Sequence, residues 1–414
     1  MVISLLLGLI YLAFISLGLP DPMLGAAWPV MYPELGAALS YAGLISLIIC
    51  AGTVLSSLLS ERLTARLGTG LVTAISVAMT ALALLGFSRA PDFLTLCLLA
   101  VPYGLGAGGV DAALNNYVSL HYSSRDMSFL HAFWGLGTMI SPYIMSFCLS
   151  AGMNWRRGYL YVFILQAVLS AVLFLSLPMW KKAELFFTEK SYGPLCPPVR
   201  EDTDADGNPL PPVEKPRALL GLSGALRVPG VPFVLLAFFC YCSFETTAGL
   251  WASSYLVEGR GIKAETAAAF ASLYYIGITA GRFVNGLAVN RLGDRRTVRI
   301  GVLIMLLGTG LMLLGRFASV LALAGLVVCG LGCAPVFPSM IHATPANFGA
   351  ARSQGIIGVQ MASAYIGSAL VPPLFGLLAQ RIDVRLYPFF LLLAALLLLA
   401  ATELLNRKIA YIKD

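Results

Sequence analysis

Twelve apolar runs divide this chain, and each is long enough to cross a bilayer, since a spanning helix needs about 20 mostly apolar residues. Of the 414 residues, 58% are hydrophobic and 11% are charged, whereas a soluble domain carries about 25% charged residues. We therefore predict an all-α membrane protein with twelve transmembrane helices in two pseudo-symmetric six-helix bundles. The runs cover residues 4–32, 40–60, 69–88, 93–120, 127–151, 158–179, 230–257, 266–290, 298–315, 319–343, 353–380 and 386–405.

One long polar segment, residues 180–228, separates the first six runs from the last six. It contains PLCPPVREDTDADGNPLPPVEKP, a stretch rich in proline and acidic residues with little that could pack in a core. Such a composition is typical of a flexible linker. We predict an N-terminal bundle over 1–180, a cytoplasmic linker over 181–228 and a C-terminal bundle over 229–414.

The basic residues indicate how the chain lies in the membrane. With both termini in the cytoplasm, the segments on that side hold 18 lysines and arginines, the opposite side holds eight, and Arg282 falls inside a run. Retained loops carry such a positive excess, so we predict a multi-pass protein of the plasma (cytoplasmic) membrane with both termini inside. The net charge of +7 lies in these short loops and indicates no nucleic-acid partner. The first basic residue is Arg62, which argues against a cleaved signal peptide.

The two halves of the sequence repeat each other. RLGTGLV begins at Arg66 and RLGDRRT at Arg291; YGLGAGG begins at Tyr103 and CGLGCAP at Cys329. These pairs are 225 and 226 residues apart, and a spacing of 224 places Asp21-x-x-x-Gly25 on Glu245-x-x-x-Gly249. A duplicated six-helix unit is typical of secondary transporters, whose binding sites lie at the repeat interface near the membrane midplane.

With this repeat, the chain resembles the major facilitator superfamily. That family carries a Gly-x-x-x-Asp-Arg-x-Gly-Arg loop after spans two and eight. The second copy here keeps Gly286, Arg291, Gly293 and a basic pair, while the first copy keeps Arg66 and Gly68 but has Glu61 and Ala65 where Gly and Asp are usual. Within the family the chain looks most like the fucose and glucose/galactose permease branch, because Asp21, Asp111 and Asn115 match the acid of span one and the acid–Asn pair of span four. The resemblance implies a transporter that works by alternating access.

Four ionisable side chains fall within the apolar runs: Asp21, Asp111, Glu245 and Arg282. A charge at the centre of a bilayer costs at least ~3 kcal/mol on insertion scales, so such residues are usually functional. Burial disfavours the charged form of a carboxylate. A buried acid can therefore hold a proton and release it when it is exposed to the other side. We predict proton coupling by Asp111, with Asp21 and Glu245 as further acids, and with Na⁺ as the alternative ion.

Several uncharged polar and aromatic side chains are candidates for solute binding. Asn115 lies one helical turn from Asp111, and His131 and Trp134 share a helix face near the start of span five. Gln360 occupies a related place in the second half. A tryptophan beside polar groups suits stacking on a sugar ring, although an interfacial aromatic gives the same pattern. His121 and His342 lie near helix ends and are expected to be ordinary surface histidines.

Glu245 and Arg282 allow two interpretations, a structural ion pair between spans seven and eight or a part of the solute or proton site. A buried charge pair satisfies both groups in either case. Arg282 is counted here with the substrate-binding candidates.

The stretch SLGLPDPMLGAAWP places Asp21 between two prolines. Proline lacks the backbone N–H that a helix interior needs, so we predict one long first helix with a kink at this point. Broken backbone is tolerated in a membrane where it lines a cavity. Asp21 is therefore expected to face the central cavity.

These features favour a proton-coupled symporter for a small polar solute, a sugar or polyol by resemblance, rather than an enzyme. The glycine-rich GLGAGG does not follow a strand of a βαβ unit, so no dinucleotide is expected, and no cofactor or metal site is predicted. The partners expected are the solute, the proton and lipid, and we expect a monomer. Three alternatives stay open: an efflux antiporter for amphipathic compounds, an organic-anion carrier that uses Arg282, and a membrane sensor on a transporter fold.

Overall fold

The computed structural model describes residues 2–37, 41–192, 220–262 and 264–413, and the regular elements within these ranges are all helical. Ten stretches of the described ranges are long and apolar enough to cross a membrane, which confirms a multi-pass, all-α membrane protein. The elements are α1 (Val2–Gly18), α2 (Met23–Glu34), α3 (Tyr41–Leu67), α4 (Thr69–Phe87), α5 (Phe93–His121), α6 (Ser124–Ser150), α7 (Trp155–Leu175), α8 (Leu177–Tyr192), α9 (Gly221–Arg227), α10 (Val231–Ser254), the π-helical turn η1 (Tyr255–Gly259), α11 (Ala264–Leu292), α12 (Asp294–Leu314), α13 (Ser319–Cys333), α14 (Val336–His342), α15 (Thr344–Phe348), α16 (Ala350–Arg381), the short 3-10 turn η2 (Val384–Leu386) and α17 (Tyr387–Lys413).

Two of the twelve predicted spans lie outside this set of ten. The eighth forms α11, for which the side chains of residues 264–272 are not described. The first is divided between α1 and α2 by a turn at residues 19–22. The break is wider than the predicted kink, because Pro20 and Pro22 both lack an N–H and the chain resumes with a bond from Met23 N to Pro20 O of 3.2 Å. Asp21 lies within this turn.

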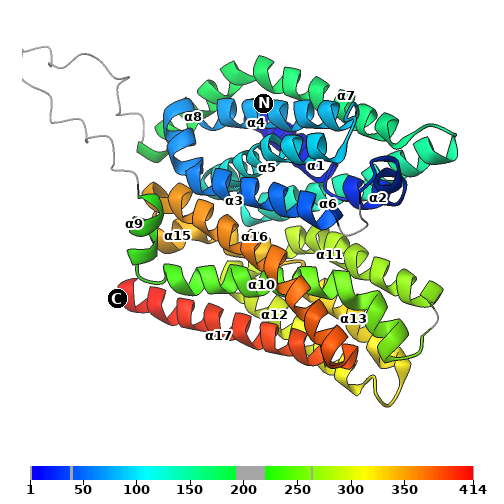
Figure 1. Ribbon diagram of the computed structural model, residues 1–414. Coiled ribbons are helices and arrows are strands. Elements are labelled where there is room, and N and C mark those ends of the chain that lie inside the picture. Colours follow the sequence, from blue (N-terminus) through cyan, green and yellow to red (C-terminus); the bar gives the residue numbers. More distant parts are fainter. Residues whose placement is uncertain (1, 38–40, 193–219, 263, 414) are drawn as a thin grey trace, which may run out of the picture.

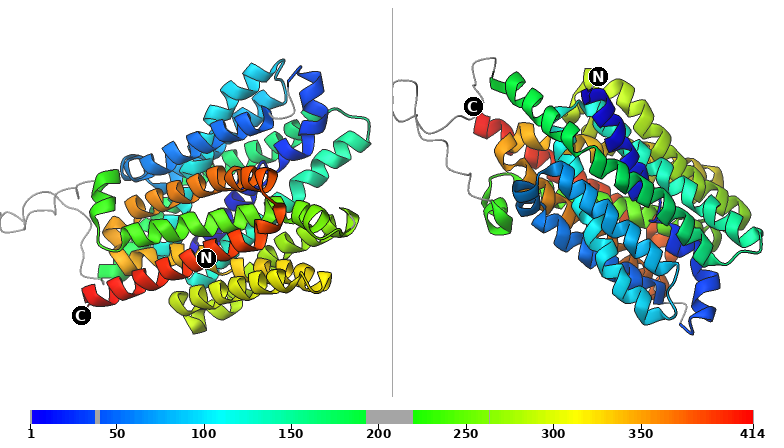
Figure 2. Two further views of the ribbon diagram at one scale, coloured as in Figure 1. Left: turned by 60° about the horizontal axis from the view of Figure 1, so that its bottom comes forward. Right: turned by 90° about the horizontal axis from the view of Figure 1, so that it is seen from above.

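The helices up to α8 pack mainly on one another, and so do those from α10 onward (Figure 1). Figure 2 shows the long helices of both groups running side by side along one general direction. The groups meet where α3 and α5 pack on α16 and where α6 packs on α11. We call them the first half and the second half below.

The repeated loop motif adopts the same backbone in both halves. Gly68 precedes α4 with φ 76° and ψ 156°, and Gly293 precedes α12 with φ 77° and ψ 153°. A positive φ is readily adopted by glycine and strained for other residues. The glycine that the sequence repeats is thus the residue that lets a long helix end and the next begin at equivalent places.

Part of the segment predicted as a flexible linker is helical. Residues up to Tyr192 continue α8, and α9 forms over Gly221–Arg227, while residues 193–219 lie outside the described residues. The start of α9 is held by Glu61 of α3, whose carboxylate oxygens accept hydrogen bonds of 2.8 Å from Leu220 N and Gly221 N. The acid that departs from the usual loop motif therefore anchors the return of the linker.

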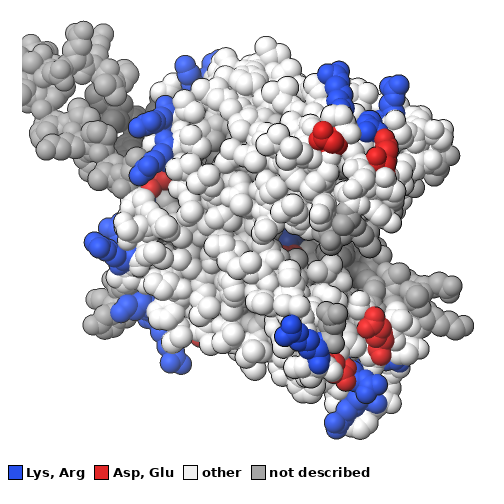
Figure 3. Space-filling view, in the orientation of Figure 1, with Lys and Arg blue, Asp and Glu red and all other residues white. Residues whose placement is uncertain are grey.

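Hydrogen bonds join the two halves at the end of the molecule that holds α9 and the C-terminus, here called the linker end (Figure 1). Figure 3 shows basic side chains gathered at this end and a recess between the halves in which one basic and one acidic patch are visible. These hydrogen bonds run from first-half residues to second-half residues. The pairs are Asn116–Ser353 at 2.6 Å, Ser128–Asn285 and Ser124–Asp294 at 2.7 Å, Tyr122–His342 at 3.1 Å, Ser60–Gln354 at 3.2 Å and Arg125–Asn290 at 3.3 Å.

His342 corrects one expectation from the sequence. It takes part in the contact between the halves and is not an ordinary surface histidine. Its Nδ1 lies 2.7 Å from the Asp294 carboxylate, and its Nε2 lies 3.1 Å from Tyr122 O. The sequence could not indicate these partners, because they come from residues 48 and 220 positions away.

At the opposite end, Glu34 ties α2 to α7. Its carboxylate accepts hydrogen bonds from Trp155 Nε1 at 2.6 Å and from Arg156, which also reaches Ala90 O at 3.1 Å. The hydrogen bond from Arg156 lowers the pKa of Glu34, with Trp155 acting in the same direction. Because the folded-state pKa is lowered, ionised Glu34 stabilises the folded protein at pH values above the unfolded-state pKa, about 4.3. This stabilisation is lost as pH falls through the folded-state pKa.

We expect Glu34→Gln to lower the Tm slightly at neutral pH. The free energy of unfolding should fall by less than about 1 kcal/mol, because solvent screens the ion pair between Glu34 and Arg156. The difference from wild type should shrink as the solution is acidified below the unfolded-state pKa. Thermal unfolding of both proteins across this pH range measures it. A difference that grows toward acid pH would contradict the assigned ionised pair.

Candidate functional site

Asp111 lies in the middle of α5, where close helix packing buries it. A Cβ at Gly104 or Gly108 would overlap the backbone oxygen of Ile49 or Thr53 on α3, so these glycines allow the close approach predicted from the sequence. Asp111 keeps only 6% of its surface exposed. A carboxylate at such a place needs hydrogen-bond donors.

Two side chains donate hydrogen bonds to that carboxylate, and a third extends the chain of hydrogen bonds. Asn115 Nδ2 donates to Asp111 Oδ1 at 2.8 Å, and the Tyr365 hydroxyl of α16 donates to Oδ2 at 2.6 Å. The remaining Asn115 oxygen lies 3.0 Å from His131 Nε2. Since the Asn115 amide nitrogen already donates to Asp111, the histidine is the donor in this pair and carries its proton on Nε2.

Asp21 forms a second cluster at the break between α1 and α2. Its carboxylate accepts hydrogen bonds from Trp134 Nε1 at 3.1 Å and from the Tyr103 hydroxyl at 3.4 Å. Asp21 is exposed, although helices α5 and α6 supply both donors. Of the two acids predicted within the spans of the first half, Asp111 is thus buried and Asp21 is accessible.

Arg282 and Glu245 form the ion pair that the sequence allowed, with Nη2 3.1 Å from Oε1. The guanidinium also lies 5.6 Å from the centre of the Trp134 ring and directs Nη1 to His131 O at 3.5 Å. Cation–π contacts at such distances are attractive. The pair therefore belongs to the second half but contacts the first half through α6.

Seven of the eight predicted site residues fall into these connected clusters. His131 joins them, because its ring bonds Asn115 and its carbonyl accepts from Arg282. The seven are Asp21, Asp111, Asn115, His131, Trp134, Glu245 and Arg282.

Gln360 is the predicted residue that the structure does not bring into these clusters. It is fully buried in α16, and both ends of its amide bond the Thr344 hydroxyl, at 3.0 and 3.1 Å. A ligand role for Gln360 would require Thr344 to release it.

Tyr365 and Tyr103 are the functional candidates that sequence reasoning missed. Each donates a hydroxyl to one of the acids. A tyrosine inside an apolar run is an unremarkable feature, and its role depends on a helix that is distant in sequence: Tyr365 is 254 residues from Asp111.

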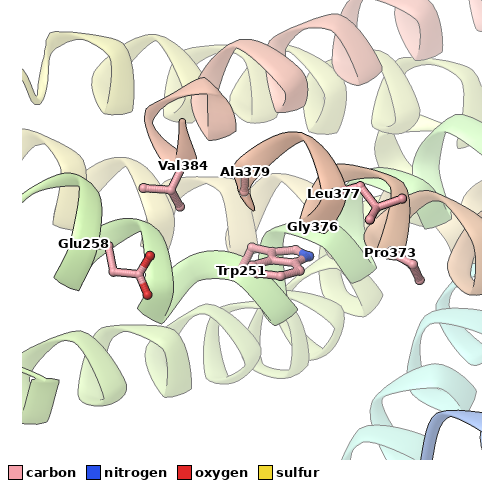
Figure 4. Close-up of a pocket in the computed structure, with 7 residues that line it drawn as sticks. All are labelled: Trp251, Glu258, Pro373, Gly376, Leu377, Ala379 and Val384. Atoms are coloured by element: carbon pink, nitrogen blue, oxygen red, sulfur yellow. The ribbon is translucent and has the colours of Figure 1, made fainter. Parts of the chain in front are cut away.

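A separate cavity of about 420 Å³ lies between α10, η1, α16 and η2 (Figure 4). The Trp251 indole that forms one wall is held by a 2.9 Å hydrogen bond to Pro372 O. None of the predicted site residues lines this cavity. The lining consists of Trp251, Glu258, Pro373, Gly376, Leu377, Ala379 and Val384.

Two curated proteins are similar to the chain along most of its length. Bypass of stop codon protein 6 from Saccharomyces cerevisiae is 24% identical over 394 residues, covering 91% of this chain and 77% of that protein. The Hexuronate transporter of Bacillus subtilis is 23% identical over 303 residues, covering 71% and 66%.

Solved transporter structures share the fold. FucP in the outward conformation superposes with a TM-score of 0.73 at 15% identity, covering 96% of this chain and 97% of that one. The human organic anion transporter MFSD10 gives 0.73 at 14%, covering 96% and 98%, and the proton:xylose symporter XylE gives 0.75 at 12%, covering 97% and 95%.

A family model of transporters extends over nearly the whole chain. The model of the Major Facilitator Superfamily matches residues 10–271 and 233–408. These matches overlap, and together they include every residue placed in the site above. The family that the loop motifs and the repeat predict is therefore confirmed: the chain belongs to the Major Facilitator Superfamily.

Proposed function

We propose that this protein is a secondary active transporter that carries a small polar solute, a sugar or polyol, together with protons. The observation that supports it most is the 2.6 Å hydrogen bond between Asp111 and Tyr365, which joins the two halves at a buried carboxylate. A group that changes charge at such a place connects protonation to the contact between the halves. The names of FucP, a fucose:proton symporter of E. coli, and of XylE agree with this class of substrate and ion.

Alternating access would follow from the arrangement of the halves. We propose twelve spans, made of the ten apolar stretches together with residues 4–32 of α1 and α2 and with α11, in two six-helix bundles over residues 1–180 and 229–414. The segment 181–228 then joins the bundles in the cytoplasm, where the positive excess of the loops also places both termini. The halves are joined at the linker end and Asp21 is exposed, an arrangement that would correspond to a state open to the outside of the plasma membrane.

The proton step would run through Asp111. When Asp111 is ionised, Asn115 and Tyr365 both donate to it, and the halves are held together at this point. A proton that arrives from the recess removes the charge and weakens both bonds, since hydrogen bonds to ionised acceptors are about twice as strong as neutral ones. Asp21 would be the first acid that a proton meets.

The solute would bind between the two acids. Asn115, His131 and Trp134 offer an amide, an imidazole and an aromatic face along one side, a combination that suits hydroxyl groups on a ring. Asp21 accepts from Trp134 and can exchange that bond for a solute hydroxyl. Gln360 would join this set after Thr344 releases it. We propose that the protein works as a monomer.

A thermal-shift screen of the purified protein tests this proposal. A neutral sugar or polyol that binds should raise the Tm, because a ligand present at 100 times its Kd stabilises the folded state by about 2.7 kcal/mol. The shift should differ between acidic and neutral pH if a proton binds with the solute. Stabilisation by amphipathic compounds, with none by sugars or polyols, would favour the efflux alternative instead.

A further inference from the structure

We propose that the central site takes a hydroxylated carboxylate, such as a sugar acid, whose carboxylate replaces Glu245 on Arg282 while Glu245 takes up a proton. This inference rests on the proposed function and names its substrate class. It starts from the hydrogen-bond state of Arg282 rather than from the acids of the first half.

Arg282 has donor groups that the protein leaves unused. The guanidinium offers five N–H bonds. Among the described residues it makes a 3.1 Å bond to Glu245 and a long bond of 3.5 Å to His131 O, and it also interacts with the Tyr241 hydroxyl. Its Nε has no hydrogen-bond partner among the described residues, although Arg282 is 3% exposed. A buried donor left without a partner is destabilising, so the site would be stabilised by an acceptor that reaches it.

A planar carboxylate supplies the acceptor that this geometry lacks. Arginine binds carboxylates through two parallel N–H···O bonds, one of which can come from Nε. Glu245 engages one nitrogen only, through Oε1. An incoming carboxylate that bonds both Nε and Nη2 would therefore make a better partner than Glu245 makes here.

A solute can reach Glu245 directly, but it can reach Arg282, whose side chain is 4% exposed, only when Glu245 moves aside. The Glu245 side chain is 22% exposed, and Trp134 connects Arg282 with the exposed Asp21. A bound sugar acid would thus have the Arg282 guanidinium at one end and the Trp134 indole along the face of its ring. The Asp21 carboxylate would accept a hydrogen bond from a hydroxyl at the other end.

The charges of the site require a proton to accompany such an anion. Asp21, Asp111 and Glu245 together carry three negative charges when ionised, against one positive charge on Arg282. The ionisable groups that face Glu245 are Arg282, Tyr274 and Tyr275 on α11, Tyr241 and Cys242 on α10, and Cys333 on α13.

Arg282 is the cation of that set. Glu245 would lose its counter-charge when the substrate takes the guanidinium, and a carboxylate left without its counter-charge is unfavourable at such a place. A proton from the recess would then bond to the released Glu245 oxygen. Each anion should bring one proton more than its neutral analogue, so the net charge moved per cycle is the same for both.

Uptake into proteoliposomes with a pH-sensitive dye inside tests this inference. Glucuronate and galacturonate are compared with glucose and galactose, and protons are counted per solute. We expect the acids to enter with one additional proton each, and Arg282→Lys to reduce uptake of the acids ~30-fold more than it reduces uptake of the neutral sugars, because the bidentate fork is lost. Arg299→Lys, which changes an exposed ion pair with Glu403 on other helices, is the matched control and should leave both unchanged.

A second variant keeps the test meaningful if Arg282→Lys fails to fold. Glu245→Gln preserves the shape of the partner but cannot take the proton, so uptake of the acids should continue without the additional proton. Proton-coupled entry of neutral sugars with no entry of acids would overturn this inference and leave the proposed function standing. Failure of all four solutes to enter would contradict both.

Discussion

Asp111→Asn is expected to abolish the accumulation of solute driven by a pH gradient while leaving exchange of solute across the membrane in place. Asparagine keeps the size of the side chain and can still accept a hydrogen bond, from Asn115 or Tyr365, but it cannot take up a proton. One coupled proton and a gradient of about two pH units can sustain at most ~100-fold accumulation, about 2.7 kcal/mol. The variant should lose essentially all of this factor.

Two measurements on the same proteoliposomes separate coupling from folding. Uptake against an imposed pH gradient reports the coupling, and exchange of labelled for unlabelled solute at equal pH reports the remaining cycle. Glu258→Gln, which neutralises an exposed acid in the separate cavity of Figure 4, is the matched control and should accumulate solute like wild type. Full accumulation by Asp111→Asn would show that the proton is carried elsewhere.

Gly358→Ala is expected to hold the linker end open and to stop transport. Gly358 of α16 lies against α3 of the first half, where a Cβ would overlap Ser57 O and come within 2.8 Å of Ser60 Oγ. A backbone oxygen cannot move aside alone, and such overpacking typically costs about 1–3 kcal/mol. This cost applies only to the state in which the halves are joined at the linker end. The population of that state should therefore fall about 5- to 150-fold relative to the open state.

Spin labels on Arg125 and Arg295 measure this change, because both side chains are exposed and lie at the linker end of α6 and α12. The distance distribution should move to longer values in Gly358→Ala. Gly310→Ala is the control, since a Cβ there has no neighbour within 4 Å. An unchanged distance together with lost transport and a lowered Tm would mean that the methyl group damages folding rather than one state.

The sequence was sufficient for the features that depend on local composition. Apolar length fixes where a helix can span lipid, and the two prolines around Asp21 predict an interruption of the first helix at the correct residues. The repeat correctly pairs Gly68 with Gly293. Glu245 and Arg282 could be predicted as partners because two unpaired buried charges on neighbouring spans are costly.

Contacts between the halves could not be predicted in the same way. The donor to Asp111 is Tyr365, and the partners of His342 come from both halves. Such pairs depend on how two long helices cross, which a single sequence does not specify. Gln360 shows the same limit, because its place in the repeat suggested a ligand contact but gave no sign of the hydrogen bonds between its amide and Thr344 on a neighbouring helix.

The most direct test of proton-coupled transport is to count protons and solute in the same wild-type vesicles. With a sugar, polyol or sugar acid that the thermal-shift screen identifies, addition of solute to the outside at equal pH should acidify the interior. The proton-to-solute ratio should be constant over a range of solute concentrations. Solute entry at the same rate with no movement of protons would contradict the account and identify a facilitator without coupling.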